Sequence, residues 1–127
     1  MRGKTSRRRK NATDYDAGMK MPEPSARALE RMHAIGDDLA DRGVKRGSMF
    51  GAPSLKAGTK VVCSVWADDL VVKLPPDDLA VALKLKGSSL FEPMAGRAMK
   101  EWAQVPFAHA KRWPGLVEAA LGYVGGG

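Results

Sequence analysis

The stretch that most constrains the fold is residues 60–74, KVVCSVWADDLVVKL, in which two valine-rich runs flank a polar break at Asp68 and Asp69. Two such runs joined by a short polar turn predict a β-hairpin. In the second run one face carries only apolar residues, which are Leu70, Val72 and Leu74. Val71 and Lys73 alternate with them, as in a strand that buries one face and exposes the other. The hairpin therefore needs amphipathic helices to cover its apolar face.

Helical patterns on both sides of the hairpin supply that cover. The first begins at Ser25, carries an apolar stripe at helical spacing, and ends at Gly43. The second follows Pro75 and Pro76 and closes at Gly87. A third begins at Pro114. Each pattern predicts a helix with one face on the sheet.

Further strands are predicted before and after the second helix. Residues 44–50 and 53–56 are predicted as two short strands, and residues 97–105 as a strand that follows a turn at residues 93–96. The predicted fold is α+β, with an antiparallel sheet of about four to five strands and three helices packed against it. The predicted order is α-β-β-β-β-α-β-α.

Basic charge is concentrated at the start of the chain. Of the 127 residues, the first 20 carry seven Lys or Arg against two Asp, and the others carry fourteen against twelve, so that +5 of the net +7 lies in residues 1–20. This leader has too few apolar residues to fold alone. We therefore predict a disordered basic arm over residues 1–20 and a single domain over residues 21–127.

Neither a membrane span nor a secretory signal is expected. No run approaches the eighteen or so apolar residues that a spanning helix needs, and the basic start has no apolar stretch behind it. The single cysteine, Cys63, lies in a valine-rich strand pattern and has no partner for an internal disulfide. This pattern is typical of a protein of the reducing cytoplasm.

The residues able to act as nucleophiles or metal ligands do not form a recognisable catalytic or metal-binding pattern. Cys63 is expected to be a small buried residue, and His33 with Asp37 lacks a third metal ligand nearby. Neither a G-x-G-x-x-G sequence nor a phosphate-binding loop is present. We expect no enzyme activity, no cofactor and no metal, and an enzyme of unknown type is kept as a second alternative.

Two motifs carry a family resemblance. They are MFG at residues 49–51 and FEPMAGRAMKEW at residues 91–102, with the LVVKL strand at residues 70–74 between them. In sequence and order these elements resemble the N-terminal domain of the TfoX/Sxy family, and the likeness spans about residues 25–124.

The resemblance implies a fold and a class of function. The fold is a compact α+β unit similar to that of secretion chaperones. Members of the family regulate natural competence together with a transcription activator and carry a second, C-terminal domain. We expect no such second domain here, so the sequence resembles a stand-alone relative of the N-terminal domain. The family supplies no catalytic residues.

These observations predict a non-catalytic regulatory or protein-interaction module, linked to transcriptional regulation through the resemblance, whose partner is another protein or a second copy of the chain. The candidate partner-binding residues are Met49, Phe50, Gly51, Arg97, Met99, Lys100 and Trp102. The first alternative is a nucleic-acid-binding protein that uses its arm without sequence preference. The candidate contacts for that alternative are Arg7, Arg8, Arg9, Lys10, Lys45 and Arg46, followed by Lys111 and Arg112.

The nucleic-acid alternative makes a direct prediction. Binding of DNA or RNA should be weak and steeply salt-dependent, and it should be lost when residues 1–20 are removed, because phosphate attraction by an arm is purely electrostatic. Fluorescence anisotropy of a labelled oligonucleotide across a salt series measures this. Salt-insensitive, sequence-selective binding by residues 21–127 would contradict the prediction.

Overall fold

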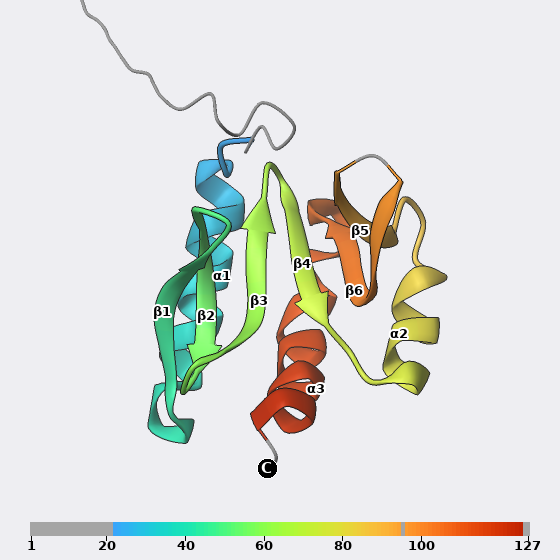
Figure 1. Cartoon of the computed structure of the whole chain (residues 1–127). Helices are drawn as coiled ribbons and strands as arrows, with labels where there is room; N and C mark the ends of the chain where they lie inside the picture. Colours follow the sequence, from blue (N-terminus) through green and yellow to red (C-terminus); the bar gives the residue numbers. More distant parts are fainter. Residues whose placement is uncertain (1–21, 95, 126–127) are drawn as a thin grey trace, which may run out of the picture.

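The computed structural model describes residues 22–94 and 96–125, so the predicted arm lies outside the described residues. The described residues form an α+β fold in which three α-helices and two short 3₁₀ helices accompany one sheet (Figure 1). The elements are α1 (Ala26–Asp38), η2 (Ala40–Arg42), β1 (Val44–Met49), β2 (Ala52–Ala57), β3 (Lys60–Trp66), β4 (Asp69–Lys73), α2 (Pro76–Leu83), β5 (Ser89–Met94), β6 (Arg97–Pro106), η3 (Phe107–Arg112) and α3 (Trp113–Gly125).

The sheet has six strands in the order β1-β2-β3-β4-β6-β5, and every neighbouring pair is antiparallel. The predicted α+β class and the three α-helices are confirmed, whereas the strand count of four to five is wrong. The missed strand is β5, whose sequence SLFEPM lacks apolar alternation and contains Pro93. Because β5 is an edge strand, it needs hydrogen bonds from β6 alone and tolerates a proline.

Several predicted boundaries also shift. The strand predicted to run to Phe50 ends at Met49, because Phe50 and Gly51 form a two-residue turn in which both residues have positive φ, +53° and +81°. Turns of this kind match the twist of a tight hairpin. The first helix ends at Asp38 and not at Gly43, because the separate 3₁₀ helix η2 lies between them. The second helix ends at Leu83 and not at Gly87.

One face of the sheet, the helix face, packs against α1 and α3. The pairings Cys63↔Val72 and Val65↔Leu70 place these four side chains on the same face, and all four are fully buried. They belong to one cluster with residues of α1 and α3. In α1 a glycine, Gly36, faces Leu55 of β2 so closely that an added Cβ would lie 2.7 Å from the leucine side chain.

The opposite face, which we call the hairpin face, is also buried at its centre. The pairings Ser54↔Ser64 and Ser64↔Val71 place these three residues on that face, and at most 1% of each is exposed. The prediction that Val71 lies on an exposed face is therefore wrong. It fails because this face carries packed side chains of its own, among them Trp66, which contacts Phe91 of the β5–β6 hairpin.

A corner in β6 brings that hairpin into place. The β5–β6 register passes from Leu90↔Ala103 to Phe91↔Met99, so Lys100, Glu101 and Trp102 have no opposite residue on β5. Beyond this corner the hairpin leaves the line of the other strands (Figure 1). The fully buried ring of Phe91 then meets Trp66 of β3 edge to face, with 4.9 Å between ring centroids, although β3 and β5 are not neighbours in the sheet.

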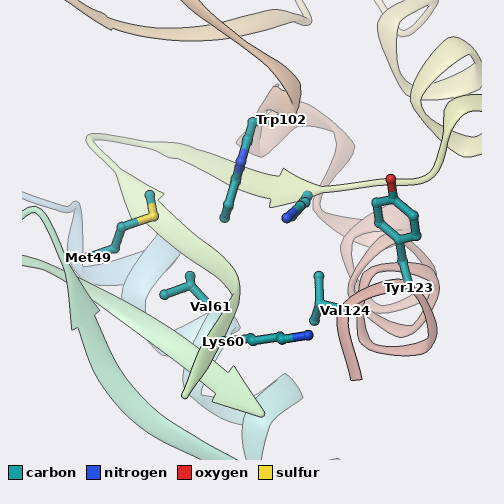
Figure 2. Close-up of a pocket in the computed structure, with 7 residues that line it drawn as sticks. Met49, Lys60, Val61, Trp102, Tyr123 and Val124 are labelled. Carbon is teal, nitrogen blue, oxygen red and sulfur yellow. The ribbon is translucent and has the colours of Figure 1, made fainter. Parts of the chain in front are cut away.

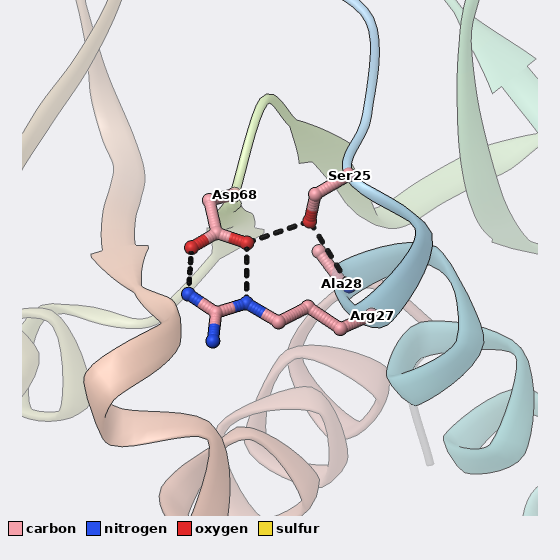
Figure 3. A network of polar contacts seen from close by, with 4 residues as sticks. All are labelled: Ser25, Arg27, Ala28 and Asp68. Atoms are coloured by element: carbon pink, nitrogen blue, oxygen red, sulfur yellow. Dashed lines mark hydrogen bonds and ion pairs between the residues drawn. The ribbon is translucent and has the colours of Figure 1, made fainter.

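A polar network fixes the start of α1 to the β3–β4 turn (Figure 3). The Ser25 hydroxyl accepts a hydrogen bond from the Ala28 amide at 3.2 Å, which caps the helix, and donates one to Asp68 at 2.6 Å. Arg27 donates to both oxygens of the same carboxylate, and its guanidinium lies 4.2 Å from the centroid of the Phe107 ring. The hydrogen bonds from Arg27 and then from Ser25 lower the pKa of Asp68 to about 2.

Within residues 22–94 and 96–125, no helix combines the length and the apolar character needed to cross a membrane.

Replacing Phe91 by alanine tests whether the hairpin face is a true second core. We expect Phe91→Ala to lower the free energy of unfolding by about 3 kcal/mol, since it empties a fully buried aromatic site. Urea denaturation measures the change. The matched control is Val81→Ala, which shortens an exposed side chain on α2 and should change stability by less than about 0.5 kcal/mol. Equal effects of the two substitutions would contradict a second core.

The Asp68 network predicts a pH dependence. The pKa of Asp68 in the folded protein, about 2, lies below the ordinary value. The stability that the Asp68 carboxylate contributes is therefore complete above about pH 4 and is lost as the pH falls towards 2. The ion pair is well exposed, so solvent screening limits the loss in Asp68→Asn at pH 7 to about 1 kcal/mol. Urea denaturation of the wild-type protein and of Asp68→Asn should show a smaller difference in the free energy of unfolding at about pH 2.5 than at pH 7. A difference that is independent of pH would exclude the carboxylate as its source.

Candidate functional site

The structure brings together two of the predicted partner-binding residues that are far apart in sequence. Met49 ends β1, and Trp102 lies at the corner of β6. Both line one pocket of about 390 Å³ that reaches from the hairpin face to the end of α3. Figure 2 shows this pocket with its lining side chains. We call it the Met49–Trp102 pocket, and its residues are Met49, Lys60, Val61, Lys73, Trp102, Tyr123 and Val124.

The corner of β6 explains why Trp102 is available there. Trp102 pairs with Lys73 of β4, which places the two side chains next to each other on the same face of the sheet. The Leu74 amide donates a 2.9 Å hydrogen bond to the Glu101 carbonyl, so the corner is held to the end of β4. Since β5 offers no residue opposite Trp102, the indole is only half-buried. An aromatic ring on a fixed backbone is thus presented to the pocket.

A second hollow continues the surface beyond Trp102. Its volume is about 360 Å³, and its lining residues are Met99, Lys100, Glu101 and Trp102. Because Trp102 lines both hollows, the two adjoin at this residue and together make up the surface around Trp102. Three predicted residues, Met99, Lys100 and Trp102, therefore lie on this surface with Met49.

The charged groups of this surface are mostly lysines. Lys73 lies 3.5 Å from the Glu101 carboxylate, in an ion pair in which both side chains are at least one-third exposed. Lys60 is exposed and forms no ion pair with the residues that the structure describes. The pocket therefore combines apolar walls with two ammonium groups at its sides, an arrangement suited to an anionic group attached to an apolar body.

The other predicted partner residues lie near this surface without lining it. Phe50 is 46% exposed in the β1–β2 turn beside Gly51, and Arg97 is exposed at the start of β6, opposite Met94. None of the three lines either hollow.

The nucleic-acid candidates do not form a single cluster in the described part of the chain. Lys45 and Arg46 are exposed neighbours on the edge strand β1, so their side chains leave opposite faces of the sheet. Arg46 lies 3.5 Å from the Asp37 carboxylate. Lys111 and Arg112 are exposed at the end of η3. The candidates Arg7, Arg8, Arg9 and Lys10 lie outside the described residues.

The cysteine and the two histidines considered for catalysis do not form a catalytic arrangement in the described part of the chain. Cys63 is fully buried, and burial raises the pKa of its thiol to about 12, which opposes formation of a nucleophilic thiolate. Partial burial and then the nearby Arg46 lower the pKa of His33. His109 hydrogen-bonds to the Lys86 carbonyl at 2.8 Å. Within the described ranges, no group of three or more His, Cys, Asp or Glu side chains is placed to hold a metal ion.

Sequence reasoning missed most of the residues around Met49 and Trp102. Lys60, Val61 and Lys73 belong to the central hairpin, where the pattern indicates only strand positions. Tyr123 offered a signal: it is a large aromatic residue off the apolar stripe of the last helix, and it is 40% exposed. Val124 reaches the same pocket from that helix.

Comparisons of the chain with protein-family models, with curated proteins and with solved structures find no match.

Proposed function

We propose that this protein is a non-catalytic protein-interaction module that binds its partner through the surface around Trp102. The observation that carries the proposal is the convergence of Met49 and Trp102, from the first and the fifth strand in the sheet order, on one open pocket. Methionine and tryptophan are enriched where proteins meet, and tryptophan frequently dominates binding energy.

The architecture around the pocket supports this role. Trp102 stands on a sheet strand whose corner is held by hydrogen bonding to β4, so the ring is positioned before a partner arrives. Binding then costs little conformational entropy. The methionines Met49 and Met99 add flexible, polarizable side chains that adapt to the shape of a partner.

The resemblance to the N-terminal domain of the TfoX/Sxy family supports a regulatory setting for this module. The MFG and FEPMAGRAMKEW motifs that carry the resemblance contain Met49 and Trp102. The proposal is accordingly a cytoplasmic module with a secretion-chaperone-like fold, linked to transcriptional regulation and acting with a protein partner or as a homodimer. Binding of nucleic acid through residues 1–20 is the alternative, and the salt series described above tests it.

Affinity capture with the full-length chain tests the proposal. We expect Trp102→Ala to lower recovery of a specific partner from native lysate by about thirtyfold, the effect of removing an interfacial anchor worth about 2 kcal/mol. Val81→Ala is the matched control, because it shortens an exposed apolar side chain on α2, away from the pocket. If the partner is a second copy of the chain, sedimentation equilibrium should show weaker self-association for Trp102→Ala than for Val81→Ala.

Urea denaturation first establishes that both variants are folded. Recovery of every specific partner by folded Trp102→Ala at the wild-type level, together with unchanged self-association, would contradict the proposed surface.

A further inference from the structure

The geometry points to an acidic peptide segment with one large aliphatic side chain as the occupant of the Met49–Trp102 pocket. This inference rests on the proposed function and names the chemistry of the partner. The aliphatic side chain would enter the pocket, and the carboxylates beside it would meet the lysines at its sides.

The walls of the pocket fit an aliphatic group. Val61 of β3 and Val124 of α3 supply branched aliphatic surface, and Met49 and Trp102 lie to either side of Val61 in Figure 2. The volume of about 390 Å³ is within the range of sites that hold small organic groups. A single leucine-sized or methionine-sized side chain can therefore exchange water contact for contact with the pocket walls.

The charge of the surface selects an acidic occupant. The pocket and the adjoining hollow together contain the three lysines Lys60, Lys73 and Lys100 and the one glutamate Glu101, a net charge of +2. Lys60 has no ion-pair partner among the described residues, and the Lys73–Glu101 pair is long and exposed. An incoming carboxylate therefore gains a partner without breaking a buried ion pair.

The same charge argues against other occupants. The chain's own leader, residues 1–20, has a net charge of +5 and would be repelled. A single-stranded nucleic acid would satisfy the lysines, but the walls offer methionine and valine beside only two aromatic residues, Trp102 and Tyr123, and include no arginine. Stacking platforms for bases depend on aromatic faces and on arginine.

Peptide titration of the full-length protein tests the inference. The probe is an N-acetylated, C-amidated peptide of sequence Gly-Asp-Leu-Glu-Gly, and the matched control replaces Asp by Asn and Glu by Gln. NMR of the assigned Trp102 indole N–H reports binding. We expect the acidic peptide to bind about tenfold more tightly than its amide control, the result of two exposed charge contacts.

Variants identify the lysines responsible. Lys60→Gln and Lys73→Gln should each weaken binding of the acidic peptide about threefold, whereas Lys84→Gln, an exposed lysine that follows α2, should leave it unchanged. Equal binding of the two peptides, no shift of the Trp102 signal at millimolar peptide, or tighter binding of an oligothymidylate at the same signal would overturn the inference. A Trp102 signal that moves with protein concentration alone would assign the pocket to a second copy and would also overturn it.

Capture experiments separate failure of this inference from failure of the proposed function. If Trp102→Ala loses the partner while the double variant Lys60→Gln, Lys73→Gln retains it, the interaction surface stands and the acidic occupant is wrong. If Trp102→Ala retains every partner, the proposed function itself is wrong.

Discussion

The central strands β3 and β4 are buried on both faces at their centre, and the rest of the structure depends on keeping water from both. Cys63 and Val72 face the helices, whereas Val71 faces the other way, and all three are fully buried. An antiparallel sheet commonly leaves one face in water. Here α1 and α3 cover the helix face, and on the other face Phe91 of the β5–β6 hairpin packs against Trp66.

The corner in β6, which brings Phe91 against Trp66, also creates the candidate site. To place Phe91 against Trp66, β6 must turn a corner, and the three residues of that corner have no opposite residues on β5. Trp102 is one of them, so its indole lies half-buried between two hollows. The exposed aromatic ring is thus a consequence of how the sheet buries its own centre, and hydrogen bonding to β4 holds the ring in position.

The two long helices contribute to opposite ends of β3. The start of α1 is tied to the β3–β4 turn by Ser25, Arg27 and Asp68, whereas the end of α3 contributes Tyr123 and Val124 to the pocket at the other end of β3. The site is therefore built on regular elements at every side. A surface built in this way presents a fixed shape to a partner, which favours recognition by complementarity.

The sequence by itself determined the α+β class, the central hairpin and the three helices, because alternation of apolar residues and helix boundary signals are local properties. The sequence also drew attention to Met49 and Trp102, because they belong to the two motifs that carry the family resemblance and not because their position in space could be predicted. Only the tertiary structure decided that β5 is a strand, that Val71 is buried and that Lys60, Lys73 and Tyr123 join the pocket. Those features depend on contacts between residues distant in sequence, which outweigh the local pattern.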